Sequence, residues 1–185
     1  MAYDPAQVYQ PEADTFLLLA AARAEVRSGD RVLEIGTGTG HIAMALAQNY
    51  DIVVTDINPH AVLCAQKNGL NVVRNDLCAG IRGTFDLVIF NPPYLPTRPE
   101  ERIDDWLEYA LDGGITGREV IGRFAKSVGN VLSPSGRILL LVSSLTGIPE
   151  IRDLFEKNGF LVEIFRQETI EDEILYVLRI TRDNG

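Results

Sequence analysis

The segment Asn91-Pro92-Pro93-Tyr94 contains the residue types of this 185-residue chain that most directly suggest chemistry. It follows the apolar run 85–90, which is typical of a buried parallel strand, and two consecutive prolines end such a strand. The chain therefore turns at the strand's carboxyl end and presents an amide side chain, backbone carbonyls and an aromatic ring. An amide oxygen and a carbonyl accept hydrogen bonds from a planar NH2 group, and a ring can pack against its flat face. The segment predicts a binding site for a planar nitrogen.

A glycine turn at residues 36–40 indicates that a second ligand binds nearby. It reads Gly-Thr-Gly-Thr-Gly and lies between an expected strand and an expected helix. Its glycines can take positive φ and let a ligand approach the backbone. The dinucleotide fingerprint needs its third glycine one residue later, so that interpretation fits poorly. Asp56 ends the next expected strand, where a carboxylate can accept hydrogen bonds from both ribose hydroxyls. The two features favour an adenosine-containing ligand.

In their order along the chain, these motifs resemble the class I S-adenosylmethionine-dependent methyltransferases of the N-P-P-Y type, which modify planar amide or amino nitrogens. Two further stretches, 8–18 and 113–120, are similar to the HemK-type N5-glutamine methyltransferases. They are most similar to the short archaeal and eukaryotic branch, which acts on the class 1 peptide-release factor. The resemblance covers nearly the whole chain. It departs from the family at Ala13, where a glutamate is expected, with Glu12 one residue earlier.

The resemblance implies S-adenosyl-L-methionine as the cofactor. It implies that Asp56 takes the ribose hydroxyls and that Asp76 accepts from the adenine amino group. Glu34 and Thr15 would position the amino-acid end of the cofactor, and Tyr9 would help to cover it. Two glycines would approach the methionine portion, and the Leu77 backbone would lie beside the adenine. The cofactor-binding residues expected on this basis are Tyr9, Thr15, Glu34, Gly36, Gly38, Asp56, Asp76, Leu77 and Asn91.

The same resemblance makes Asn91, Pro92, Pro93 and Tyr94 the expected catalytic residues. Methyl transfer to an amide nitrogen is an in-line displacement, so orientation and near-attack distance carry much of the barrier reduction. The Asn91 side-chain oxygen and the Pro92 carbonyl would accept from the two N–H bonds and raise electron density on the nitrogen. The proline pair would keep these acceptors rigid, and Tyr94 would pack against the amide plane. No metal site is expected, because the two cysteines form no C-x-x-C pair.

The charge of the chain bears on its substrate. It has 17 basic and 26 acidic residues, a net charge of -9 and no basic run. Nucleic-acid binding usually shows a basic patch, so a protein substrate with a basic surface fits better. The expected substrate is a glutamine of a peptide-release factor, with or without its GTPase. Methylation of an adenine or guanine amino group in DNA or RNA stays open, because a flipped base presents a similar NH2 plane. Protein lysine methylation is a further alternative.

The elements that must position these residues alternate between strand and helix patterns, which favours a doubly wound α/β sheet. Together with the resemblance, this predicts a seven-stranded, Rossmann-like class I methyltransferase fold. Apolar runs predict strands at 31–35, 52–55, 71–74, 85–90 and 137–142. Helices are expected at 12–27, 41–49, 59–68, 118–131 and 148–158. The tail predicts two closing strands, 160–165 and 174–180, joined by the turn 171–173.

The chain length and its 46% apolar content suit one well-buried domain over residues 1–185, with residues 1–28 covering the cofactor. We expect no separate substrate-docking domain. Short-branch relatives work with a small zinc-binding activator subunit, and the resemblance implies that it would pair with the edge strand near Val72-Val73. The alternative is an edge capped by its own loops. No apolar stretch approaches the roughly 20 residues that span a membrane, which predicts a cytoplasmic protein.

Two residues beyond the N-P-P-Y segment keep alternative interpretations. Arg118 follows three glycines at the start of an expected helix, and it could be a solvated surface cation or a contact to the substrate. Trp106 could pack beneath the loop 95–117 or line the entrance for the substrate. The sequence alone does not decide between these interpretations.

Overall fold

The computed structural model describes residues 3–102 and 105–185. Residues 1–2 of the expected domain and residues 103–104 of the loop 95–117 lie outside the described residues. Its strands are β1 (Arg31–Ile35), β2 (Asp51–Asp56), β3 (Val72–Arg74), β4 (Phe85–Phe90), β5 (Leu132–Ser143), β6 (Phe160–Ile170) and β7 (Glu173–Arg182). Its α-helices are α1 (Ala13–Glu25), α2 (His41–Leu46), α3 (Pro59–Lys67), α4 (Trp106–Tyr109), α5 (Glu119–Ser127) and α6 (Ile148–Glu156). Its 3-10 turns are η1 (Pro5–Gln7), η2 (Pro99–Glu101), η3 (Val128–Asn130) and η4 (Ser144–Thr146).

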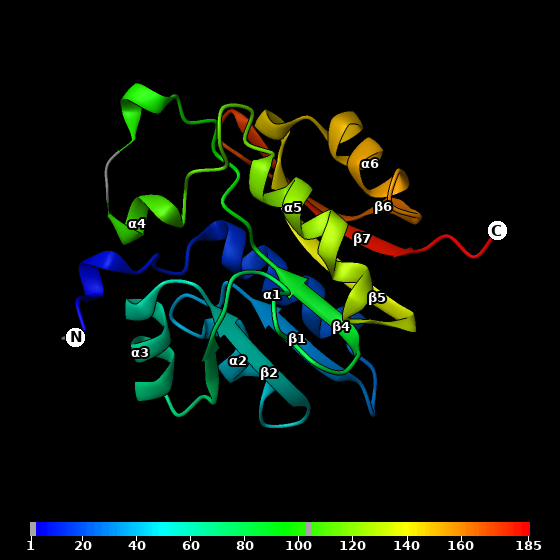
Figure 1. Ribbon diagram of the computed structural model, residues 1–185, viewed down its shortest axis with the longest axis horizontal. Helices are drawn as coiled ribbons and strands as arrows, with labels where there is room; N and C mark the ends of the chain where they lie inside the picture. Colours follow the sequence, from blue (N-terminus) through cyan, green and yellow to red (C-terminus); the bar gives the residue numbers. More distant parts are fainter. Residues whose placement is uncertain (1–2, 103–104) are drawn as a thin grey trace.

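The seven strands form one sheet in the order β3-β2-β1-β4-β5-β7-β6 (Figure 1). The strands from β3 to β5 pair in parallel, and β7 is antiparallel to both β5 and β6. This confirms the seven-stranded α/β fold expected from the sequence. Within the described residues, no helix is long and apolar enough to cross a membrane.

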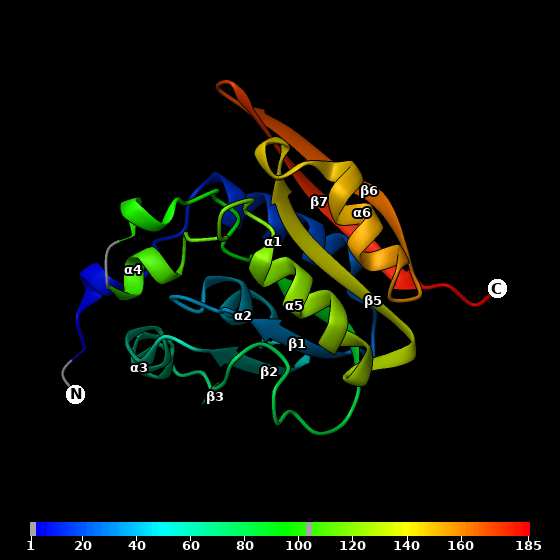
Figure 2. The ribbon, with the colours of Figure 1, turned by 45° about the horizontal axis from the view of Figure 1, so that its top comes forward.

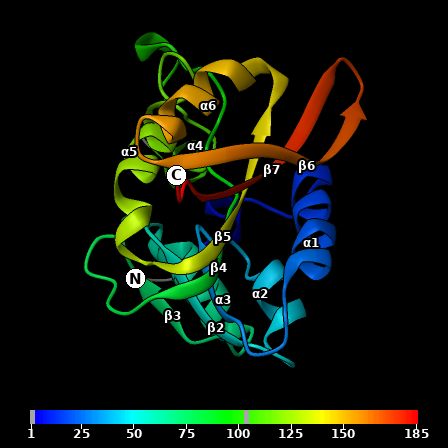
Figure 3. The same cartoon turned by 90° about the vertical axis from the view of Figure 1, so that its right-hand side faces the viewer.

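Helices cover both faces of the sheet, because its central strands bury side chains on both sides. In β4, Val88 and Phe90 pack with α5 and α6, whereas Leu87 and Ile89 pack with α1 and α2. Figure 3 views the sheet along its edge and shows the two helix pairs on opposite sides. This three-layer packing fixes the carboxyl ends of the parallel strands relative to one another.

The expected elements are all present and differ from the observed ones mainly at their ends. Two of the largest differences between expected and observed ends lie near Pro134 in the sequence, at the end of α5 and at the start of β5. Strand β5 begins at Leu132 rather than Arg137, and the helix expected through Val131 ends at Ser127 and continues as η3. The pairing of β4 with β5 shifts register between Phe85 and Leu87. A proline is tolerated at such an irregularity because it removes no regular ladder bond.

Helix α1 is held at its carboxyl end by a buried arginine of β5. Arg137 is 4% exposed, and its guanidinium donates to Glu25 Oε1 at 3.0 Å and to Asp30 Oδ2 at 2.6 Å. It also donates to the backbone carbonyls of Glu25 and Asp86. These bonds fix the carboxyl end of α1 against the sheet. The amino-terminal end of α1 lies at the carboxyl ends of the parallel strands.

Candidate active site

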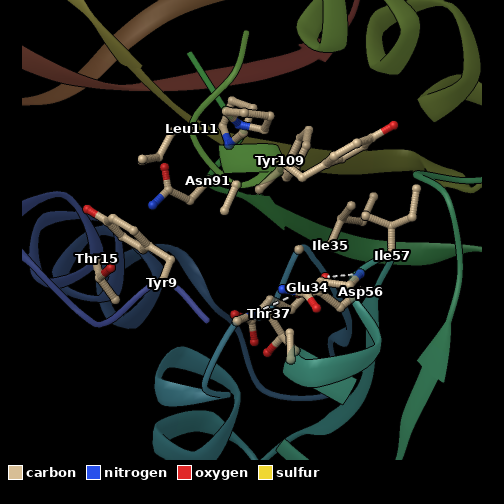
Figure 4. A pocket seen from close by; sticks show the side chains of 18 of the residues that line it. Tyr9, Thr15, Glu34, Ile35, Thr37, Asp56, Ile57, Asn91, Tyr109 and Leu111 are labelled. Atoms are coloured by element: carbon tan, nitrogen blue, oxygen red, sulfur yellow. Dashed lines mark hydrogen bonds between the residues drawn. The ribbon is translucent and has the colours of Figure 1, made fainter. Parts of the chain in front are cut away.

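A cavity of about 480 Å³ lies at the carboxyl ends of β1, β2 and β4. Ligands of doubly wound sheets bind at this edge, where the strand order reverses between β1 and β4. Figure 4 shows Asn91 and Tyr9 on one side of the cavity, and Glu34 and Asp56 on the other. Every residue proposed from the sequence lines the cavity: Tyr9, Thr15, Glu34, Gly36, Gly38, Asp56, Asp76, Leu77, Asn91, Pro92, Pro93 and Tyr94.

The glycine turn after β1 leaves little room for side chains. Gly36 has a φ of 67°, and a Cβ there would lie 3.3 Å from Cε2 of Phe90. Gly38 has a φ of 56°, and its Cβ would lie 3.6 Å from the Tyr9 carbonyl oxygen. Because L residues rarely adopt these φ values, glycine is the residue that lets this turn form beside the cavity.

Asp56 connects the glycine turn to helix α3. Its Oδ2 accepts from Gly38 N and its Oδ1 accepts from Asn58 N, both at 2.8 Å. Asn58 in turn caps α3, because its side chain accepts from His60 N at 2.8 Å. Burial raises the pKa of the Asp56 carboxyl group above its usual value. Each carboxylate oxygen has a further lone pair, so the group can also accept from two ligand hydroxyls.

Glu34 is a buried carboxylate that lacks a complete set of partners. The residue is 4% exposed, and its Oε2 has no hydrogen-bond partner among the described residues. Burial raises the pKa of Glu34 to about 8. An unpaired buried carboxylate is costly, and a cationic ligand group beside it would offset that cost. The α-amino group of S-adenosylmethionine is such a cation, so this side of the cavity fits the expected cofactor.

The segment after β3 contributes Asp76 and Leu77. Asp76 Oδ2 accepts from Nη2 of Arg123, a pairing that the sequence did not predict. A carboxylate can accept further bonds, so this pairing is compatible with an adenine amino group at Asp76. Leu77 has a φ of 50°, and Asn75 Nδ2 donates to its carbonyl at 2.8 Å. Non-glycine residues seldom adopt such a φ, and those that do cluster at ligand sites.

The amino-terminal segment crosses this edge of the sheet. Val8 is 2% exposed, and the Gln7 carbonyl accepts from Asn58 Nδ2 at 2.7 Å. The Gln7 side chain accepts from Trp106 N at 2.8 Å. Tyr9 follows directly and lines the cavity. The segment is thus bonded both to α3 and to α4 at the edge that holds the candidate site.

Asn91 follows β4 and joins the amino-terminal end of α1. Its Nδ2 donates to Asp14 Oδ2 at 3.0 Å. Its Oδ1 is buried and has no partner within the described part of the chain. Tyr94 lies nearby, and the pKa of its phenol is raised by burial and by the negative charges of Asp14, Glu173 and Glu12. The site therefore offers an unused acceptor beside a neutral aromatic ring.

Comparison with known proteins identifies the family. The family model of the methyltransferase small domain matches residues 11–103. The putative protein N5-glutamine methyltransferase of Methanocaldococcus jannaschii is 41% identical over 184 residues, which cover 95% of this chain and 92% of that protein. The chain belongs to the HemK-type protein N5-glutamine methyltransferases. It is therefore an S-adenosylmethionine-dependent N-methyltransferase, as the sequence resemblance predicted.

Two further HemK-type relatives align with nearly the whole chain. Human methyltransferase HEMK2 is 35% identical over 192 residues, covering 95% of this chain and 90% of that protein. The Mtq2 and Trm112 complex of E. cuniculi, which methylates the eRF1 translation termination factor, contains a chain with a TM-score of 0.80 and 32% identity. That match covers 95% of this chain and 99% of the other. The TM-score and the coverage show that the two chains share one fold over nearly their whole lengths.

The glycine-rich stretch after the N-P-P-Y segment holds that segment in place. Gly113 N donates to the Leu95 carbonyl at 2.9 Å, and Leu95 N donates to the Leu111 carbonyl at 3.1 Å. Gly117 has a φ of 70°, and a Cβ there would lie 2.4 Å from the Tyr94 carbonyl oxygen. The similarity of residues 113–120 to HemK-type enzymes thus has a physical reason in this chain, because the stretch packs directly against the N-P-P-Y segment and Leu95.

We expect Gly117→Ala to lower kcat about 10-fold. The added Cβ must displace the Tyr94 carbonyl, and this displacement would also move the Asn91 side-chain oxygen and the Pro92 carbonyl. Gly159→Ala is the matched control. Gly159 has a φ of 79° and nothing within 4 Å of its Cβ, so it reports the backbone cost alone. Steady-state kinetics and thermal unfolding of both variants test this. Equal activity of the two variants would contradict the role assigned to the contact.

The structure shows the contacts of Arg118 and the place of Trp106, the two residues with alternative interpretations. Nη1 of Arg118 donates to the Thr146 carbonyl at 2.5 Å, so this arginine ties the start of α5 to η4. Arg118 is therefore bonded to the backbone rather than free in solvent, and its contact to the substrate stays a prediction. Trp106 lines the cavity together with Tyr109, which is 60% exposed, so an aromatic wall stands at the entrance.

Asp14, Glu173 and Asn58 are among the cavity-lining residues that the sequence did not single out. Asp14 is 4% exposed and accepts a hydrogen bond from Asn91. In the sequence it was only one residue of the stretch 8–18 that resembles the HemK-type enzymes. Glu173 begins β7, far along the chain, and its Oε1 has no partner among the described residues. Asn58 caps α3 and also lines the cavity. Its additional bond to Gln7 depends on the path of the amino-terminal segment, which no local pattern indicated.

Proposed function

We propose that this enzyme methylates the N5 atom of a glutamine side chain in a peptide chain release factor. The observation that carries the proposal is the buried Oδ1 of Asn91 at the cavity wall, which has no hydrogen-bond partner in residues 3–102 and 105–185. A glutamine amide offers an NH2 group, and an acceptor without a partner is what such a group requires. The names of the relatives support the same reaction, because they describe N5-glutamine methylation and methylation of eRF1.

The chain's own residues suit this reaction as binding and orienting groups. The bound cofactor supplies an electrophilic methyl group on a sulfonium. We propose that Glu34 and Thr15 hold the amino-acid end, Asp56 the ribose and Asp76 the adenine. Gly36, Gly38, Leu77 and Tyr9 would complete the enclosure, and residues 1–28 would cover it within one domain spanning residues 1–185.

At the substrate end, we propose that Asn91 Oδ1 and the Pro92 carbonyl accept from the two N–H bonds of the glutamine amide. This arrangement raises electron density on a nitrogen whose lone pair is otherwise delocalised into the carbonyl. Pro93 keeps the loop rigid, and Tyr94 packs against the amide plane. As the N–C bond forms, the C–S bond of the sulfonium would break and leave neutral S-adenosylhomocysteine. The methylated nitrogen would then release its extra proton to water, so no strong base has to act before transfer.

The charge of the cavity favours a protein over a nucleic acid. Arg123 is the only lysine or arginine among the described residues that line it, and it is paired with Asp76. The lining includes six carboxylates: Glu12, Asp14, Glu34, Asp56, Asp76 and Glu173. A phosphate backbone would be repelled by this lining, whereas a basic protein loop would be attracted. A release factor as substrate implies a cytoplasmic site of action.

Transfer of labelled methyl from S-adenosylmethionine tests the proposal. The acceptors are the purified release factor, the same protein with its loop glutamine changed to asparagine, DNA and RNA. Mass spectrometry locates the modified residue. Label that is confined to the glutamine and is lost in the asparagine variant is the expected result. Label on nucleic acid alone, or on a lysine, would replace glutamine methylation with the corresponding alternative.

We further propose that a small zinc-binding activator subunit pairs with β3. This strand is an edge of the sheet next to β2 (Figure 2). Val73 on it is 56% exposed. An exposed apolar edge strand is a template for strand addition from another chain. The complex of E. cuniculi Mtq2 with Trm112 supports a partner of this kind.

Val73→Asp is expected to weaken binding of the partner at least about 10-fold, because it places an unpaired charge in an apolar contact. Leu161→Asp is the control, since Leu161 is 51% exposed on β6, the opposite edge strand. Co-purification and calorimetry with the partner measure the effect. Equal weakening by both substitutions would place the contact elsewhere.

A further inference from the structure

The orientation of the Asn91 amide group is set by a neighbouring carboxylate. The oxygen and nitrogen of an asparagine side chain are nearly equal in shape, so only hydrogen-bond partners determine which one faces the substrate. Asn91 has one such partner in the structure, Asp14 Oδ2, at 3.0 Å from its Nδ2. A carboxylate accepts and does not donate. The NH2 end of Asn91 must therefore face Asp14, and Oδ1 must face the cavity.

Asp14 is itself surrounded by donors, which keeps it an acceptor. The hydroxyl of Tyr9 donates to Oδ2 at 3.1 Å, and the hydroxyl of Thr15 donates to Oδ1 at 3.1 Å. The backbone N of Thr15 also donates to Oδ1. Oδ1 thus faces two donors of Thr15, and Oδ2 faces the hydroxyl of Tyr9 and the Nδ2 of Asn91. The residue is 4% exposed, so water does not compete for these bonds.

We propose that Asp14 is a positioning residue for methyl transfer, which fixes the Asn91 amide so that its oxygen meets the substrate NH2 group. This inference rests on the proposed glutamine methylation and extends it. A reversed Asn91 amide would bring its own NH2 group against the NH2 group of the substrate, and neither could accept. Asp14 thereby makes the site selective for groups that donate hydrogen bonds. Its negative charge also strengthens Asn91 Oδ1 as an acceptor, because linked hydrogen bonds polarise one another.

A reciprocal exchange of the two side chains tests the proposal. Asp14→Asn allows either amide orientation at both positions, and we expect kcat to fall about 100-fold. Asn91→Asp places two carboxylates against each other and should cost at least as much. In the double variant D14N/N91D, the Asn at position 14 donates to the Asp at position 91, which again faces the substrate as an acceptor. We expect the double variant to regain at least about 10-fold in kcat over N91D, a coupling that independent sites do not show.

Three further measurements make the outcome decisive. Asp153→Asn removes an exposed carboxylate on α6 and controls for loss of charge, and its kcat should be unchanged. Calorimetry with S-adenosylhomocysteine and thermal unfolding show whether each variant binds cofactor and folds. In the wild-type enzyme, the Asn91 side-chain amide protons should exchange with solvent more slowly than those of exposed Asn158. That NMR measurement needs neither substrate nor variant.

Rescue in the double variant together with slow exchange at Asn91 is the expected result. A folded, cofactor-binding double variant no more active than N91D would overturn the proposal. Exchange at Asn91 as fast as at Asn158 would overturn it as well, even where a variant fails to fold. If the wild-type enzyme places no label on glutamine, the proposed function fails, but the exchange measurement still tests the contact with Asp14.

Discussion

Asn91→Ala is expected to lower kcat for glutamine methylation on the order of 1000-fold, which corresponds to about 4 kcal/mol of transition-state stabilisation. The substitution removes the unpartnered Oδ1 that would accept from the substrate amide. Without it, the substrate nitrogen loses both an electron-donating contact and its orientation toward the methyl group. Single-turnover kinetics with saturating cofactor and release factor measure the effect on the chemical step.

The same variant should bind cofactor almost as well as the wild type, with a dissociation constant within about threefold. Four of the eight residues proposed to hold the cofactor belong to β1, β2 and the turn after β1, whereas the side chain of Asn91 bonds to Asp14 of α1. Asn158→Ala is the control for removal of an asparagine, because the exposed side chain of Asn158 donates to the carbonyl of Leu154 near the end of α6. Comparable losses of catalysis and of cofactor affinity in Asn91→Ala would sink the assignment to substrate binding.

The parts of the site that the sequence predicted share one physical property. Gly36, Asp56 and Asn91 each lie at or just after the carboxyl end of an apolar run, and parallel strands bring such ends to one edge. Their residue types also differ from the apolar residues around them, so each stands out locally. A position of this kind can be recognised before any three-dimensional information is available.

The residues that escaped prediction depend on contacts between distant segments. Asp14 and Asn91 are 77 positions apart, and their contact exists because α1 packs over the end of β4. Arg118 could not be interpreted from the sequence because its partner is the backbone carbonyl of Thr146, and a carbonyl is present at every residue. Glu173 reaches the cavity because the β6 and β7 hairpin returns toward it. Strand and helix patterns in the sequence carry no information about such tertiary contacts.

The extent of β5 was missed for a different reason. The segment 133–136 reads Ser-Pro-Ser-Gly, which is a composition typical of turns, and the strand includes it only through an irregular pairing with β4. The error did not affect the predicted site, because the site lies at the opposite end of the parallel strands. Local composition thus failed where the tertiary pairing was irregular and succeeded where it was regular.

Asp56→Ala is expected to raise the dissociation constant for S-adenosylmethionine about 100-fold, or about 3 kcal/mol. Two charge-assisted hydrogen bonds to the ribose would be lost. The bonds from Asp56 to Gly38 N and Asn58 N would be lost as well, so the glycine turn and the start of α3 would no longer be held together. Isothermal calorimetry with S-adenosylhomocysteine gives the affinity directly.

Asp51→Ala and Asp56→Asn separate the possible causes of that loss. Asp51 begins the same strand, and its exposed carboxylate lies 3.4 Å from Nε of Arg31, so it controls for removal of an acidic residue from β2. Asp56→Asn keeps the shape and one acceptor, and should cost roughly 10-fold in affinity.

At saturating cofactor, kcat of the Asp56 variants should recover to within about threefold of the wild type, because Asp56 is proposed to hold the ribose and not the substrate amide. A fall in kcat that saturation does not relieve would mean that Asp56 also positions the N-P-P-Y segment, and that cofactor binding and catalysis are coupled through the glycine turn.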